Sequence, residues 1–126
     1  MGGGWRHQVA ALLLVVLAPA GCGCSGECES SVQFGFPEVM RTVPLGSIAT
    51  ACVETTCLAF APDQETGTVF MGDGEDDSND VAATLTIRNK AGEVVFDRKT
   101  PLKLKAHKSG RFCGTACRTG AITFRP

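Results

Sequence analysis

The sequence predicts an all-β protein: a small antiparallel β-sandwich, immunoglobulin-like, stapled by disulfides and preceded by a signal peptide. Short runs of alternating apolar and polar residues, separated by Gly, Pro and Asn, continue from residue 32 onward with no helical period. The chain of 126 residues contains seven cysteines, a content typical of small exported domains. An apolar segment near the N-terminus is the third observation.

Residues 9–20 form an apolar run that follows a segment carrying Arg6 and no acidic residue, and that precedes small residues. This order is that of a secretory signal, and the run is shorter than the about 20 residues of a membrane-spanning helix. Two cleavage sites remain open. Ala18-Pro19-Ala20 fits an ordinary signal peptidase that cuts before Gly21. Pro19-Ala20-Gly21-Cys22 resembles a bacterial lipobox, except that Pro19 stands where an aliphatic residue is usual.

The number of cysteines favours the lipobox. Lipidation of Cys22 leaves six cysteines that can all pair, whereas simple secretion leaves an odd thiol. We therefore expect residues 1–21 to be a signal peptide, 22–31 a lipid-anchored tether and 32–126 one sandwich domain. The protein would lie on the outer face of the cell membrane, or outside the cell if cut after Ala20. The six cysteines are expected to form local pairs: Cys24, Cys28, Cys52, Cys57, Cys113 and Cys117.

The front half predicts short strands. Residues 32–36 alternate with Val32, Phe34 and Phe36 on one face, and Pro37 ends this strand, while Pro44 and Gly46 make 40–45 an edge segment or a loop. Residues 47–61 predict two strands around a tight turn. With Glu54 and Thr55 in the turn, Cys52 faces Cys57 in a non-hydrogen-bonded pair, whose Cα atoms lie about 4.5 Å apart. That distance is compatible with a disulfide.

Residues 62–67 predict a loop, 68–71 a short strand and 72–80 an acidic loop. Carboxylates in such a loop are potential calcium ligands, but the spacing is not that of an EF-hand, since the twelfth position from Asp73 is Thr84 where a bidentate Glu is required. We expect a solvated loop and no cofactor. The residues that could hold a cation are Asp73, Glu75, Asp77 and Asp80.

The back half predicts a hairpin of residues 81–88 and 93–98 around a turn at 89–92, and a final strand with Ile122 and Phe124 facing inward. Between them, residues 102–107 alternate apolar side chains with polar ones, which predicts one strand with a solvent-exposed, basic face. The candidate binding residues are Lys103, Lys105, Lys108 and Arg111. All seven phenylalanines are expected to pack in the core: Phe34, Phe36, Phe60, Phe70, Phe96, Phe112 and Phe124.

Charge is divided along the chain. Residues 22–87 carry eleven acidic residues and one basic residue, a net of −10, whereas 88–126 carry ten basic and two acidic residues, a net of +8. Such asymmetry can indicate a nucleic-acid or membrane partner. In a single compact domain the two halves can interleave and neutralise each other, so we expect no nucleic-acid partner.

Three segments resemble a group of small, uncharacterised secreted lipoproteins of high-GC Gram-positive bacteria. They are a Cys-Val-x-x-x-Cys hairpin at 52–57, a Leu-Thr-Ile-x-x-x-x-Gly-x-Val-Val hairpin at 85–95, and a Cys-Gly-x-x-Cys-Arg bend at 113–118. The similarity covers roughly residues 47–126. Glu54 and Thr55 occupy a turn where that group often has an acidic residue followed by Gly. The resemblance implies a compact β-sandwich with disulfides and implies no activity.

Catalytic patterns are not found. Apart from His7 in the signal, the only histidine is His107, which lies among lysines with no carboxylate close in sequence to orient it. In an oxidising compartment the thiols are expected to be paired, which disfavours a Cys nucleophile. We therefore predict a non-enzymatic, lipid-anchored envelope module that binds an envelope protein or an anionic wall polymer, of unspecified oligomeric state. The alternative is a freely secreted inhibitor of an extracellular hydrolase, with the Cys113 to Cys117 loop in the enzyme's active site.

Overall fold

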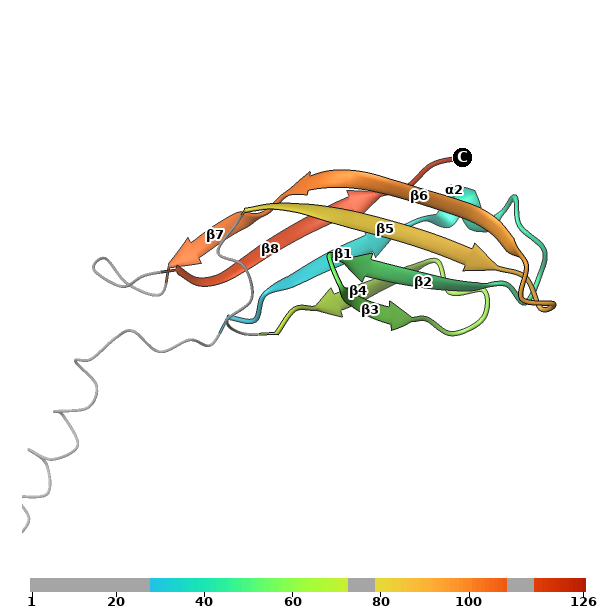
Figure 1. The fold of residues 1–126 in the computed structure, drawn as a ribbon, viewed down its shortest axis with the longest axis horizontal. Helices are drawn as coiled ribbons and strands as arrows, with labels where there is room; N and C mark the ends of the chain where they lie inside the picture. The colour runs from blue at the N-terminus through green and yellow to red at the C-terminus, as the bar shows by residue number, and fades with distance from the viewer. Residues whose placement is uncertain (1–27, 73–78, 109–114) are drawn as a thin grey trace, which may run out of the picture.

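The computed structural model describes residues 28–72, 79–108 and 115–126, which form two four-stranded sheets (Figure 1). The first sheet has the order β4-β1-β8-β7, with β1 Ser31–Gly35, β4 Thr66–Phe70, β7 Lys105–Lys108 and β8 Thr115–Thr123. The second sheet has the order β3-β2-β5-β6, with β2 Ile48–Val53, β3 Thr56–Ala59, β5 Asp80–Arg88 and β6 Val94–Lys103. The predicted small all-β sandwich is confirmed.

The core lies between the two sheets because one face of each strand is apolar. In β5, four alternate residues are buried, Val81, Ala83, Leu85 and Ile87, and β2 contributes Ala49, Ala51 and Val53 beside them. Two stacked pairs of rings belong to the same core, Phe34 with Phe124 at 6.0 Å between ring centroids and Phe36 with Phe60 at 5.9 Å.

One strand pair departs from the expected antiparallel arrangement. The first and last strands, β1 and β8, are parallel, with a register that runs from Ser31 opposite Thr119 to Gly35 opposite Thr123. Parallel neighbours need a long crossover between them, and here the intervening strands of both sheets supply it. The other pairs are antiparallel. The C-terminus consequently lies at the same end of the sandwich as α2, Pro37–Met40, a helical turn that the sequence analysis did not predict (Figure 1).

The single strand predicted for residues 102–107 is wrong: the chain changes sheets at Leu104. β6 ends at Lys103 in the second sheet, and β7 begins at Lys105 in the first. Leu104 is buried, and its N–H donates to the carbonyl of Asn79 at 2.6 Å. The period-two pattern gave no sign of this crossing, because Leu102 in β6 and Leu104 at the crossing both pack against the core, while Ala106 in β7 is exposed.

The phenylalanines are not all in the core. Phe34, Phe36, Phe60 and Phe124 are buried and Phe96 is partly buried, but Phe70 at the end of β4 is 57% exposed. Phe112 lies outside the described residues. No helix in the described parts of the chain is long and apolar enough to cross a membrane.

Candidate binding surface

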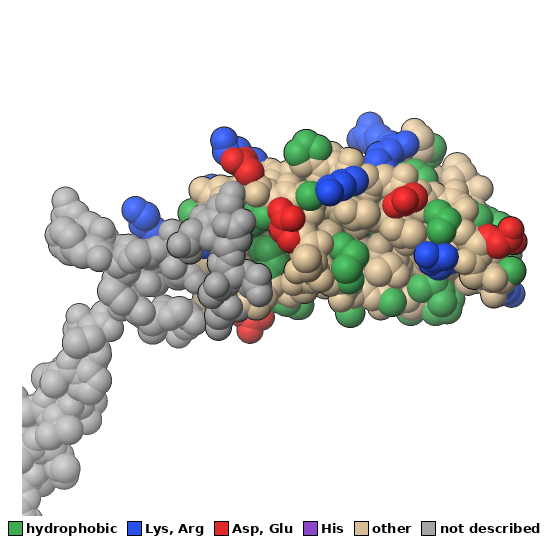
Figure 2. All heavy atoms as spheres, in the orientation of Figure 1, with side chains coloured by type: hydrophobic (Ala, Val, Ile, Leu, Met, Phe, Trp, Pro, Cys, Tyr) green, Lys and Arg blue, Asp and Glu red, His purple; other side chains and the backbone are tan. Residues whose placement is uncertain are grey.

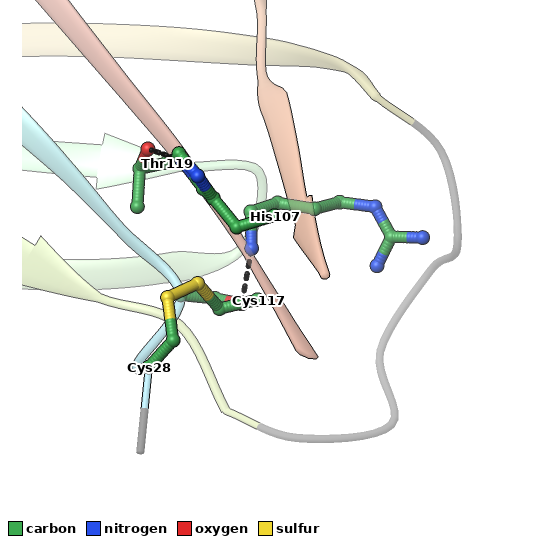
Figure 3. Close-up of a disulfide and its surroundings, with 6 residues drawn as sticks. Cys28, His107, Cys117 and Thr119 are labelled. Atoms are coloured by element: carbon green, nitrogen blue, oxygen red, sulfur yellow. Dashed lines mark hydrogen bonds between the residues drawn. A yellow bond between two sulfur atoms is a disulfide. The ribbon is translucent and has the colours of Figure 1, made fainter. Parts of the chain in front are cut away.

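One disulfide joins the segment before β1 to β8. Cys28 and Cys117 are bonded, with their Cα atoms 5.5 Å apart and 89 positions separating them in sequence (Figure 3). The predicted local pairs of Cys28 with Cys24 and of Cys117 with Cys113 are therefore wrong. Local sequence spacing could not reveal this pairing, because it depends on β1 lying beside β8. Cys22, Cys24 and Cys113 lie outside the described residues.

Hydrogen bonds reinforce this end of the sandwich. The Ser30 hydroxyl accepts the backbone N–H of Arg118 at 3.0 Å, and the Ser30 carbonyl accepts that of Met71 at 2.9 Å. The His107 Nε2 lies 2.7 Å from the Thr119 hydroxyl, so this ring nitrogen is engaged on the sheet (Figure 3). Residues 28–30, predicted as part of a tether, are thus fastened to the first sheet.

The second disulfide, Cys52–Cys57, confirms the predicted hairpin staple, with a Cα–Cα distance of 4.0 Å. The Phe60 N–H donates to the Ala49 carbonyl at 2.8 Å, which sets the alternation of the ladder and makes the Cys52–Cys57 pair the non-hydrogen-bonded kind. Glu54 begins the turn with a φ of 53°. Its carboxylate accepts the Ala82 N–H at 3.0 Å, so the turn is also tied to β5.

The outer face of the first sheet is uncharged along its middle strands. Its side chains alternate with the core residues of β4, β1 and β8, and neighbours across the strands follow the pairing register. A shallow groove of about 380 Å³ follows this face. Small side chains over β1 and β8 create it, since Gly35 and Ala121 leave space between rows of larger residues. The polar side chains that line it are Gln33, Thr66, Thr68 and Thr123.

A ring and a cation stand at opposite sides of this outer face. Phe70, Ser31, Thr119 and Lys105 are register neighbours across the four strands in that order. Phe70 and Lys105 are exposed, and the two hydroxyl residues lie between them. This surface was not predicted from the sequence. The Thr-Gly-Thr-Val-Phe alternation at 66–70 is its one sequence signal, and it became informative only once β4 was placed beside β1.

The predicted basic binding face is divided between two sheets. Lys103 belongs to β6 and Lys105 to β7, on either side of the crossing at Leu104. Lys108 follows a register shift after His107, and Arg111 lies outside the described residues. In the view of Figure 2, basic, acidic and hydrophobic side chains are interspersed. Of the three predicted residues that the structure describes, Lys105 is the one that belongs to the row containing Phe70.

The acidic loop is described only at its two ends, Gly72 and Asn79–Asp80. Asp80 begins β5, in register with Lys103, while Asp73, Glu75 and Asp77 lie outside the described residues. Within the described ranges, no group of three or more His, Cys, Asp or Glu residues could hold a metal ion.

Comparison with protein-family models, with curated proteins and with solved structures found no match to this chain. The resemblance to secreted lipoproteins therefore stays a prediction. The alternative of a secreted inhibitor assumed a loop closed between Cys113 and Cys117. Cys117 is bonded to Cys28, so this loop is not closed by a disulfide between them.

Proposed function

We propose that this protein is a non-enzymatic lipoprotein, anchored through Cys22 at the outer face of the cell membrane, that binds an anionic wall polymer. The outer face of the first sheet is the binding surface. The observation that supports this proposal is the groove on this face, which is lined by hydroxyl groups. Beside it, the row of register neighbours across the four strands begins with the exposed ring of Phe70 and ends with the cation of Lys105.

The chemistry of this surface suits a polymer that carries hydroxyls and a negative group on each repeat. Thr66, Thr68 and Thr123 can each donate and accept a hydrogen bond, and Gln33 offers both an amide N–H and a carbonyl. The Phe70 ring can cover the apolar face of a sugar. The Lys105 ammonium pairs with a phosphate or carboxylate, a contact weakened by salt because it is exposed to solvent.

Anchorage would keep the sandwich close to the membrane. Only residues 23–27 separate Cys22 from Cys28, and six steps of extended chain span at most about 20 Å. Two or more acyl chains on Cys22 would hold the protein stably at the bilayer. Because Cys28 is bonded to β8, the tether ends there, and polymers attached near the membrane are within reach of the first sheet.

The binding test is co-sedimentation of the exported, disulfide-bonded chain with purified cell walls, before and after chemical removal of their anionic polymers. We expect binding to fall when the polymers are removed. Lys105→Ser should weaken it roughly threefold to tenfold, the effect of about 1 kcal/mol. The matched control is Lys99→Ser, which changes an exposed lysine of β6 in the other sheet. Equal binding by Lys105→Ser and the original chain would contradict the proposal.

The anchor is tested by the intact mass of the protein from its native host, after thiol alkylation without reduction. We expect diacylglycerol on Cys22 and no alkylated thiol. With Cys28–Cys117 and Cys52–Cys57 formed, lipidation leaves Cys24 and Cys113 to pair with each other. A mass that begins at Gly21 and includes one alkylated cysteine would instead establish a secreted protein.

A further inference from the structure

The four edge strands of the sandwich are not equally protected against pairing with another strand. Exposed edges are usually blunted by charges, proline, bulges or short length. β6 contains Pro101 and two lysines, and β7 contains Lys105 and Lys108 with a register shift. β3 has four residues and carries the Cys52–Cys57 disulfide. β4, Thr66–Phe70, has no charged residue, no proline and an unbroken register with β1.

The backbone of β4 offers a regular set of hydrogen-bonding groups on its free side. The Glu65 carbonyl accepts from Phe36 and the Met71 N–H donates to Ser30, both at 2.9 Å, so the odd-numbered residues of this segment bond toward β1. In an antiparallel ladder the alternate residues then point the other way. These are Thr66, Thr68 and Phe70, and because β4 is an edge, no described strand pairs with them.

We propose that a second copy of this chain pairs antiparallel with β4, with Thr68 opposite Thr68 of the second copy. In this register the two Thr68 residues exchange N–H···O bonds, and Thr66 does the same with Phe70 of the second copy. The bonds connect the two first sheets into one continuous sheet of eight strands. Gln64 already donates to the Thr66 carbonyl at 2.6 Å, which leaves that oxygen one further lone pair for this purpose.

The side chains of β4 make it complementary to itself. On the outer face, threonine lies opposite threonine and the exposed Phe70 lies opposite Thr66, pairs that stabilise antiparallel sheets. On the inner face, Gly67 lies opposite Val69. No like charges oppose each other, whereas self-pairing of β7 would bring lysines together. A twofold axis through Thr68 therefore gives every β4 side chain a compatible neighbour on the second copy. This favours a second copy over an unrelated peptide.

The contact is small, so the association should be weak. Five residues from each copy bury less than a standard protein interface, and we expect a dissociation constant on the order of micromolar or above. This inference does not depend on the proposed function. If Cys22 is lipidated, confinement to one membrane raises the effective concentration and favours the pair.

The experiment is sedimentation velocity on the exported, disulfide-bonded chain with Cys22→Ser, so that no acyl group is present, from about 1 μM to about 1 mM. We expect a concentration-dependent dimer. Thr68→Lys places two ammonium groups opposite each other, and Thr68→Pro removes an N–H that points away from β1. Each should raise the dissociation constant roughly tenfold or more.

The matched control is Ala59→Lys, which adds a lysine at an exposed position of the other edge on this side, β3. It should leave the dissociation constant unchanged, and circular dichroism should show the same fold for all variants. Three results would overturn the inference: a monomer at every concentration, a dimer that Thr68→Lys leaves intact, or an equal loss of dimer in Ala59→Lys. If Thr68→Pro does not fold, Thr68→Lys decides the question.

Discussion

Gly67 shows how one missing side chain positions a ring of the core. A Cβ atom at this position would lie 2.4 Å from Cε1 and 2.5 Å from Cζ of Phe60. Phe60 is buried and stacks on Phe36, so it has no free space into which to retreat. The glycine therefore lets β4 lie directly over the ring that closes the core on this side.

Gly67→Ala is expected to lower the free energy of unfolding by about 1–3 kcal/mol, because the added methyl group forces Phe60 or β4 to move. Urea denaturation measures the change. Gly35→Ala is the control, since a Cβ there would meet the Thr123 hydroxyl at an ordinary 3.7 Å. Equal stability of the two variants would show that the Phe60 ring yields without cost.

Glu54 combines an unfavourable backbone angle with a useful side chain. Its φ of 53° is in the left-handed region, which favours glycine, but its carboxylate and its N–H both bond to the backbone of Ala82. The position of Glu54 in the turn was predicted correctly from the sequence. It could not reveal the bond to Ala82, because that residue is on a neighbouring strand 28 positions away.

Glu54→Ala should destabilise the protein by about 1 kcal/mol, because the Ala82 N–H loses its acceptor while the backbone angle persists. Glu54→Gln keeps an acceptor oxygen and should cost less. Thermal unfolding of the two variants side by side is the measurement. A Glu54→Gln variant as unstable as Glu54→Ala would mean that the hydrogen bond to Ala82 contributes nothing.

At the scale of elements, strands with local patterns were predicted well and the crossing between sheets was not. The β2–β3 hairpin has the predicted register, and β5 alternates between buried and less buried residues as expected. The change of sheets at Leu104 had no sequence signal, since the period-two pattern is the same on both sides. Leu104 also packs against Gly120, where a Cβ would lie 2.9 Å from Leu104 Cδ2.

Leu104→Ala should therefore reduce the free energy of unfolding by about 2–5 kcal/mol, because it leaves a cavity where the chain crosses between sheets. The control is Leu45→Ala, which removes a leucine side chain that is 85% exposed and should change stability by less than about 0.5 kcal/mol. Chemical denaturation distinguishes the two, and a small effect at Leu104 would argue that the crossing is loosely packed.

For the whole molecule, the two disulfides in the described part of the chain close loops of very different length, 89 positions for Cys28–Cys117 and five for Cys52–Cys57. In the chain-entropy model, the longer loop restricts the unfolded chain far more. In a chain that also carries Cys24→Ala and Cys113→Ala, so that no second bond closes the same span, removal of Cys28–Cys117 is expected to cost about 4–5 kcal/mol, against about 2 kcal/mol for removal of Cys52–Cys57.

The measurement is urea denaturation under non-reducing conditions in the Cys24→Ala, Cys113→Ala background. It compares the variant that lacks both Cys28 and Cys117 with the variant that lacks both Cys52 and Cys57. The variant that lacks Cys28 and Cys117 should be the less stable of the two. If removal of Cys52–Cys57 lowered the free energy of unfolding by as much, the disulfides would act mainly through contacts in the native state and not by restricting the unfolded chain.

The proposed pairing along β4 also has a consequence for the whole molecule. Antiparallel β4 strands place the Cys28–Cys117 ends of the two copies at opposite ends of the dimer. If Cys22 of each copy carries the proposed lipid anchor, tethers of about 20 Å at most let both copies reach one membrane only when the pair lies along its surface.

The sequence alone determined the all-β class, the strand alternation, the Cys52–Cys57 hairpin and the expectation of export, because each depends on residues close together in the chain. Tertiary structure decided the Cys28–Cys117 disulfide, the division of the basic residues between two sheets, and the outer face that joins Phe70 to Lys105. The disulfide and the outer face depend on β1 lying parallel to β8, whereas the division of the basic residues depends on the crossing at Leu104. The pairing of β1 with β8 joins opposite ends of the chain, and no periodicity within either strand specifies its partner.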